Sequence, residues 1–268
     1  LHLRDVRLGP PLPGHAAALV NPRVVGVIHL TPSSVDTWAR CRRRYLLAQV
    51  LDIPASDPKG TASAVGLVAH EVLATIHETG TCQDAGHVQG VIARRGAGEP
   101  QVAAMVDRHI RRCPSGAEAI GHELERARLE GATGALFVAT ARIDAVWAHD
   151  GILDARDYKT GRPSFVDTVS DDIRARVQAF TLAPLAAERR LRLRIRYEEL
   201  GPDAGEDPDP FEPDAEQLAA IADELAAVQA AMRAEREFRG VAESWACGTC
   251  EYRSICPDST APGEPTWP

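Results

Sequence analysis

Two aspartates and a lysine fall on what the sequence predicts to be one β-hairpin. The dipeptide Asp150-Gly151 separates two strand-like segments, which is a strong signal for a two-residue hairpin turn. With this turn, position 149 pairs with position 152, so Asp144 lies directly opposite Asp157. Because side chains on a strand alternate between its faces, Lys159 shares a face with Asp157. Two carboxylates and an ammonium group therefore converge on one patch.

This patch suits the hydrolysis of phosphodiesters. Opposed carboxylates repel each other unless a cation neutralises them, and carboxylate oxygens are ligands that Mg²⁺ and Mn²⁺ favour. The metal polarises the phosphate and acidifies a water, while Lys159 can orient that water or stabilise developing charge. The same residues also fit an ordinary surface hairpin whose charges face solvent, and a β-bulge would shift the predicted pairing.

Four of the six cysteines have a spacing that suits a metal centre. Cys247, Cys250 and Cys256 form a CxxCxxxxxC tail, and Cys41 lies far upstream among arginines. Four thiolates match either an iron–sulfur cluster or a tetrahedral zinc ion, and the residue types alone do not separate the two. Taken by itself, Cys41 also fits a buried small apolar residue.

Composition bounds the remaining possibilities. The 268 residues, 44% of them hydrophobic, can bury a full core. We find neither a membrane span nor a signal peptide, so we expect a cytoplasmic protein without a disulfide framework. Cys82 and Cys113 have no partner spacing and are assigned no metal. The net charge of −8 argues against a protein that coats nucleic acid, although local arginine clusters could hold DNA or simply be solvated.

The elements that must position these residues predict an α/β fold. We expect helices over residues 62–78, 100–112, 171–187 and 214–238, the third of them interrupted or kinked at Pro184, and strands over residues 24–30, 123–147, 152–159 and 191–197. Another helix begins at Thr31-Pro32-Ser33 and carries Cys41 on its apolar face. Residues 82–98 and 201–213 are expected to be loops.

Several motifs together resemble those of one nuclease family. The segments RID at residues 142–144 and DYKTG at residues 157–161 resemble the paired active-site motifs of RecB-like PD-(D/E)xK nucleases. GLVAH at residues 66–70 fits the family's Gly-xxx-His helix, and Gln178 resembles the glutamine of its later helix. The resemblance implies that His70, Asp144 and Asp157 bind Mg²⁺ or Mn²⁺ together with the backbone carbonyl of Tyr158. Lys159 is then the catalytic lysine.

The resemblance also implies supporting roles. Gln178 would support Lys159 or contact DNA, although the tyrosine often found one turn beyond it is here Leu182. Glu123 or Glu125 could serve as the glutamate that the family tends to carry before its first active-site strand. Gly66, one turn before His70, would leave room for a metal or a DNA strand.

The cysteines resemble those of iron–sulfur nucleases in the same branch, including AddB-type subunits and the CRISPR adaptation nucleases. This resemblance implies a [4Fe–4S] cluster, rather than zinc, that staples the C-terminus to the N-terminal helix. The arginines that flank Cys41 could follow a DNA backbone; they are Arg40, Arg42, Arg43 and Arg44.

Together these inferences predict a PD-(D/E)xK restriction-endonuclease-like core, with a central mixed sheet flanked by helices and an iron–sulfur lobe formed by both chain ends. Residues 1–30 lead into a single RecB-like nuclease domain at residues 31–268. We expect a DNA exonuclease for single strands or ends, in repair, recombination or phage defence, with unwinding left to a partner such as a helicase because the chain has no P-loop motif. The alternatives are an iron–sulfur DNA clamp or structural subunit of a helicase–nuclease complex, a zinc-stabilised interaction protein, and an RNA nuclease.

Overall fold

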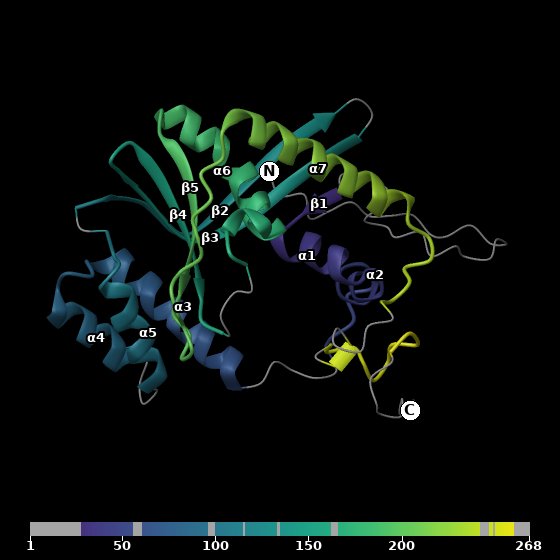
Figure 1. Cartoon of the computed structure of the whole chain (residues 1–268). Helices are drawn as coiled ribbons and strands as arrows, with labels where there is room; N and C mark the ends of the chain where they lie inside the picture. Colours follow the sequence, from purple (N-terminus) through teal and green to yellow (C-terminus); the bar gives the residue numbers. More distant parts are fainter. Residues whose placement is uncertain are drawn as a thin grey trace, which may run out of the picture.

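The computed structural model describes residues 28–55, 61–95, 100–114, 116–132, 135–161, 166–241, 247–248 and 250–259. These residues form an α/β fold in which helices flank a mixed β-sheet (Figure 1). The predicted lead-in segment, and most of the strand predicted within it, lie outside the described residues.

The sheet is organised around one long strand, β3. The strands are β1 (Ile28–Leu30), β2 (Glu118–Ala132), β3 (Ala135–His149), β4 (Ile152–Lys159) and β5 (Arg192–Glu199). Along one edge, β3 pairs with β2; along the other, it pairs first with β1 in parallel and then with β4 in antiparallel fashion. β5 adds to β4 in parallel. The range 123–147, expected to be strand-like, holds parts of two antiparallel strands, β2 and β3.

The predicted turn between β3 and β4 is confirmed. Asp150 and Gly151 both have positive φ, 49° and 73°, as a type I′ turn requires, and Gly151 adopts this conformation without steric cost. The predicted pairing holds as far as Ala145–Arg156. The turn residues thus determine which residues of the two strands face each other.

Helices cover the two faces of the sheet with two separate apolar cores. The core on one side includes residues of α3 (Thr61–Thr79), α4 (Ala85–Arg95) and α5 (Pro100–Ile110), and the core on the other includes residues of α1 (Pro32–Arg40), α6 (Ile173–Arg189) and α7 (Ala215–Ala234). Trp147 and Tyr158 lie in the first core, whereas Phe137 and Phe180 lie in the second. None of the helices in the described part of the chain is long and apolar enough to cross a membrane.

Two expectations about helices are corrected. The loop predicted at residues 82–98 contains α4, whose buried Val88 and Val91 recur at helical spacing. Pro184 lies inside α6, which continues to Arg189, so the helix is not interrupted there. In both cases packing against neighbouring elements outweighs the local preference of glycine or proline.

Candidate active site and cysteine centres

The candidate active site lies where β4 separates from β3. The ladder between the two strands ends at Ala145–Arg156, so the ladder pair expected between Asp144 and Asp157 does not form. Instead, Asp144 Oδ2 accepts a hydrogen bond from the backbone N–H of Tyr158 at 2.6 Å. A side chain thus bridges the fork between the strands.

An irregularity on the other edge of β3 brings a second carboxylate to the fork. The ladder with β2 pairs Ile143 and Ala145 but skips Asp144, which faces Glu123 across the two strands. Glu123 has a φ of 49°, a left-handed conformation that is uncommon for glutamate. The buried side chains of β3 also change sides here, since Ile143 lies in one core and Ala145 in the other. Such irregularities redirect side chains and are enriched near active sites.

Helix α3 completes this cluster with a histidine. His70 Nδ1 lies 3.1 Å from Asp144 Oδ1. One ligand atom from each of His70, Glu123 and Asp144 lies within 4.8 Å of the others. One imidazole nitrogen and two carboxylates can hold Mg²⁺ or Mn²⁺. The structure therefore selects Glu123 over Glu125 as the glutamate that joins the site.

The pKa values of His70 and Glu123 are both raised in this cluster. Burial opposes a charge on His70, but the hydrogen bond and the negative charge of Asp144 outweigh it and raise the pKa of His70 above 6.5. Burial and then the charge of Asp144 raise the pKa of Glu123 above 4.5. Negative charge is therefore crowded at the fork, as at a site that a cation would neutralise.

Asp157 lies next to this cluster and is held by two side chains. Its Oδ1 lies 2.7 Å from Lys159 Nζ, and its Oδ2 accepts a hydrogen bond of 2.9 Å from Gln178 Nε2. The expectation that Asp157 and Lys159 share a face is confirmed. Gln178, which is only 3% exposed, reaches Lys159 through Asp157. The Lys159 ammonium also lies 3.9 Å from the ring centroid of Tyr197, an aromatic partner from β5.

Two glycines allow other segments to approach the DYKTG motif closely. A Cβ on Gly66 would lie 2.5 Å from Thr160 Oγ1, so Thr160 occupies the space that we expected to be open to a metal or a DNA strand. A Cβ on Gly201 would overlap the carbonyl oxygen of Gly161. These contacts fix the end of β4, which carries Lys159.

A groove leads from the start of α1 to Asp157 and Lys159. Arg126, Arg142 and Arg174 contribute to its lining. Arg142 pairs with Glu123, and Arg174 pairs with Asp172. The sequence did not indicate that these arginines share a groove, because they come from β2, β3 and α6, far apart in the chain.

Cys41 lies at a break between two helices rather than on a helical face. Its backbone is extended, with φ −160° and ψ 111°, so it ends α1 and caps α2 (Arg42–Tyr45). Its Sγ accepts a hydrogen bond from the backbone N–H of Arg44 at 3.4 Å. A π-helical turn (Leu46–Val50) follows. The expectation of one continuous helical face through Cys41 is therefore wrong.

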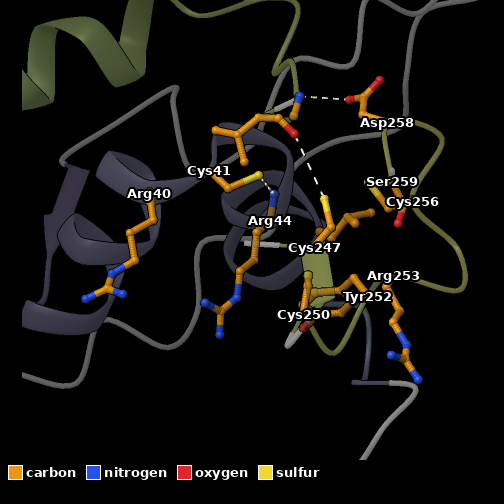
Figure 2. Close-up of a pocket in the computed structure, with 13 residues that line it drawn as sticks. Arg40, Cys41, Arg44, Cys247, Cys250, Tyr252, Arg253, Cys256, Asp258 and Ser259 are labelled. Atoms are coloured by element: carbon orange, nitrogen blue, oxygen red, sulfur yellow. Dashed lines mark hydrogen bonds between the residues drawn. The ribbon is translucent and has the colours of Figure 1, made fainter. Parts of the chain in front are cut away.

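The structure brings the four predicted ligand cysteines to one pocket (Figure 2). Cys41, Cys247, Cys250 and Cys256 all line it, and none of them forms a disulfide. Burial raises the pKa of Cys250 and of Cys256, and the Cys41 thiol adds to both shifts. Among the described residues, no three of these sulfurs lie within 4.8 Å of one another.

The arginines predicted to follow DNA all have acidic partners. The ion pairs are Arg40–Asp36 at 2.7 Å and Arg42–Glu235, Arg43–Asp258 and Arg44–Glu251, each at 2.9 Å. Three of them join the segment around Cys41 to the C-terminal part of the chain, which lies beside α2 (Figure 1). Arg40 and Arg42 still expose 52% and 55% of their side chains.

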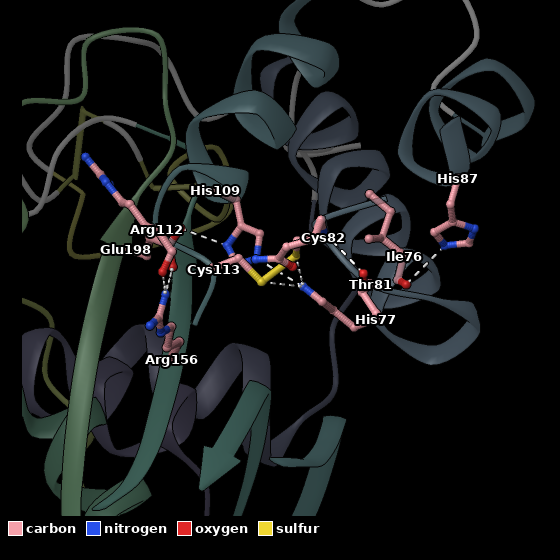
Figure 3. The surroundings of a disulfide bond; sticks show 11 residues. Ile76, His77, Thr81, Cys82, His87, His109, Arg112, Cys113, Arg156 and Glu198 are labelled. Atoms are coloured by element: carbon pink, nitrogen blue, oxygen red, sulfur yellow. Dashed lines mark hydrogen bonds and ion pairs between the residues drawn. A yellow bond between two sulfur atoms is a disulfide. The ribbon is translucent and has the colours of Figure 1, made fainter. Parts of the chain in front are cut away.

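Cys82 and Cys113, which the sequence analysis left without partners, lie together. They form a disulfide beside His77 and His109 (Figure 3). One ligand atom from each of these four residues lies within 4.8 Å of the others, so the group could hold a metal ion. The sequence signal for this group was a histidine that precedes a cysteine at short spacing twice, once as His-x₄-Cys and once as His-x₃-Cys.

Comparison with known proteins gives a family match over most of the chain. The sequence model of the PD-(D/E)XK nuclease superfamily matches residues 29–257. The crystal structure of SSO0001 is similar at 16% identity and a TM-score of 0.44, over 87% of both chains. A protein named "Putative exonuclease" from Eubacterium rectale is similar at 14% identity and a TM-score of 0.39, over 76% of this chain and 78% of that one. Comparison with curated proteins gives no match.

Proposed function

The chain belongs to the PD-(D/E)XK nuclease superfamily, and on this basis we propose that it is a RecB-like, iron–sulfur DNA exonuclease whose active site is the fork between β3 and β4. One observation supports the proposal most strongly. His70, Glu123 and Asp144 come from three separate elements and gather their ligand atoms within 4.8 Å, next to the Asp157–Lys159 pair. An ordinary surface hairpin would not recruit a histidine from a distant helix.

We assign the divalent metal to His70, Glu123, Asp144, Asp157 and the backbone carbonyl of Tyr158. When bound, Mg²⁺ or Mn²⁺ would supply Lewis-acid chemistry, which polarises a phosphate and acidifies a water. Asp144 also accepts a hydrogen bond from the backbone N–H of Tyr158. This hydrogen bond fixes the position of the neighbouring Asp157. The side chains of His70, Glu123, Asp144 and Asp157 are 15–25% exposed, so a phosphodiester can reach them.

Lys159 is assigned as the catalytic lysine. Its ammonium contacts both Asp157 and the face of Tyr197. From there it can donate a hydrogen bond to the attacking water or to a phosphate oxygen as charge develops. Gln178 is a positioning residue, because it holds Asp157 and, through it, Lys159.

The substrate that we assign is single-stranded DNA or a DNA end. The groove that reaches Lys159 offers the guanidinium groups of Arg126, Arg142 and Arg174 to phosphates. Arg40, Arg42, Arg43 and Arg44 would contribute through their exposed parts. Because the chain has no P-loop motif, a helicase or other repair or defence protein would supply the unwinding.

We assign a [4Fe–4S] cluster to Cys41, Cys247, Cys250 and Cys256. The four cysteines line one pocket, and none of them forms a disulfide. Such a cluster would fasten the two ends of the described chain, a role that the arginine ion pairs in the same region already share. Closing so long a loop restricts the unfolded chain and stabilises the folded one.

The proposal is tested with anaerobically purified full-length protein, on end-labelled single- and double-stranded DNA and on RNA, with Mn²⁺, Mg²⁺ or EDTA. We expect brown protein that contains iron and degrades DNA only with metal. Asp157→Asn should abolish cleavage but leave the colour intact, whereas the matched surface variant Asp223→Asn on α7 should cleave like the wild type. Tight DNA binding without cleavage would favour the clamp alternative, and colourless protein would remove the cluster from the proposal.

A further inference from the structure

A second group of potential metal ligands lies at the C-terminal ends of α3 and α5. His77 lies near the end of α3 and Cys82 just after it, while His109 lies near the end of α5 and Cys113 just after it. Each helix thus presents a histidine and then a cysteine about one turn later. Two such short-range pairs, contributed by two helices, are typical of tetrahedral zinc sites.

The ligand atoms converge on one point. His77 Nε2 lies 3.1 Å from His109 Nε2, 3.7 Å from Cys113 Sγ and 2.9 Å from Cys82 Sγ (Figure 3). Around zinc, the edges of the tetrahedron are about 3.3 Å between two nitrogens and about 3.6 Å between nitrogen and sulfur. The first two distances agree with this geometry. The short contact to Cys82 needs an outward shift of the sulfur.

The hydrogen bonds around His109 also suit a metal site. His109 Nδ1 lies 2.8 Å from Glu198 Oε1, and the other oxygen of Glu198 accepts a hydrogen bond of 3.0 Å from Arg156. The side chains of His109 and Glu198 are both 0% exposed. If the Nδ1–H donates to Glu198, the lone pair of His109 Nε2 faces His77. A carboxylate that orients a ligand histidine in this way is common at zinc sites.

We propose that His77, Cys82, His109 and Cys113 hold one structural zinc ion, with both cysteines as thiolates. A disulfide between Cys82 and Cys113 would leave two histidine nitrogens facing each other beside the sulfurs, with at most one shared proton. Zinc instead uses all four donors, and the two sulfurs would then lie about 3.8 Å apart. The Cα separation of 6.5 Å lies near the upper end of the disulfide range.

The ion would hold the helix that carries the active-site histidine. His77 lies seven residues after His70 on α3, so the two share one face of the helix. Through His109, Glu198 and Arg156, the zinc site also connects to β5 and β4. Metal at this point would therefore fasten α3 and α5 to the strands that carry the fork.

The test is to measure zinc, iron and free thiols in full-length protein purified anaerobically without added reductant. We expect one zinc per chain in the wild type. Cys82→Ser/Cys113→Ser should lose the zinc but keep the iron and the brown colour, whereas Cys247→Ser/Cys250→Ser should lose the iron but keep the zinc. His87→Gln is the matched histidine control, because His87 packs nearby against the Ile76 carbonyl outside the group, and it should keep both metals.

Wild-type protein alone decides the matter if a variant fails to fold. Zinc together with Cys82 and Cys113 recovered as free thiols would support the site, and so would replacement by Co²⁺ with the visible absorption of tetrahedral thiolate coordination. Zinc-free protein with Cys82 and Cys113 joined in one disulfide-linked peptide would overturn it. Loss of the zinc in Cys247→Ser/Cys250→Ser would also overturn the proposed site. These two outcomes would overturn the zinc site without contradicting the proposed cleavage at the fork.

Discussion

The carboxylate of Asp144 accepts a hydrogen bond of 2.6 Å from the backbone N–H of Tyr158, at the point where the two strands stop pairing. One oxygen of Asp144 therefore sets the position of the DYKTG segment, while the other faces His70. This double role separates Asp144 from a carboxylate that only binds metal.

Asp144→Asn should reduce cleavage by at least about 100-fold, because the amide cannot supply the same charge to a metal. The amide oxygen can still accept from Tyr158, so we expect little change in unfolding temperature. Asp144→Ala should also lower the unfolding temperature, since it leaves the Tyr158 N–H unpaired. Rates in Mn²⁺ together with thermal unfolding check this, and equal unfolding temperatures for both variants would contradict the bridging role.

Gln178→Leu should lower kcat by about 10–100-fold, as expected when a residue that orients an active-site ligand is lost. Gln178 donates to Asp157 and does not line the described groove, so the KM for DNA should change little. Gln229→Leu is the matched control, because Gln229 is equally buried but lies on α7. A purely structural role would lower the stability of the Gln178 variant without selectively lowering kcat.

Gly66→Ala should weaken cleavage, because the new methyl group would push Thr160 and with it the end of β4. Adding Thr160→Ala should restore part of the loss by making room. The double-mutant cycle then gives a coupling energy of about 0.5–3 kcal/mol, the usual range for residues in contact. Additive effects would show that Gly66 matters for another reason, such as open space for DNA.

Proton and metal should compete at His70. In metal-free protein its raised pKa means that the folded state holds this proton more tightly than the unfolded chain. The resulting stability is fully present below pH 6.5 and is lost as the pH rises through the higher folded-state pKa. In EDTA, wild type should therefore lose stability relative to His70→Gln over this range. With Mn²⁺, wild type should instead gain stability relative to His70→Gln as the pH rises. Unfolding temperatures measured across pH would reveal either behaviour.

Arg126→Ala should weaken binding of single-stranded DNA and reduce the slope of log affinity against log salt by about 0.7, the value for one lost phosphate contact. We expect this because Arg126 lines the groove that reaches Asp157 and Lys159. Arg236→Ala, an exposed arginine just after α7, is the matched control. An unchanged salt slope for Arg126→Ala would exclude the groove as the path of the DNA strand.

The sequence by itself determined the elements whose signals are local. Asp150-Gly151 fixed the hairpin turn, Thr31 fixed the start of α1, and the period of Val65, Ala69, Val72 and Ile76 fixed the buried face of α3. The order of the motifs was enough to indicate the nuclease superfamily. The turn, the helix start and the buried helix face each depend on residues a few positions apart, which act through backbone preference and side-chain periodicity.

Only the tertiary structure decided how distant residues meet. The left-handed Glu123, the fork that Asp144 bridges and the space that Thr160 takes beside Gly66 all result from neighbouring strands and helices in contact. The meeting of Cys82 and Cys113 with two histidines likewise depends on how α3 packs against α5. No local pattern contains these distances, because they are determined by which faces of separate elements bury against each other.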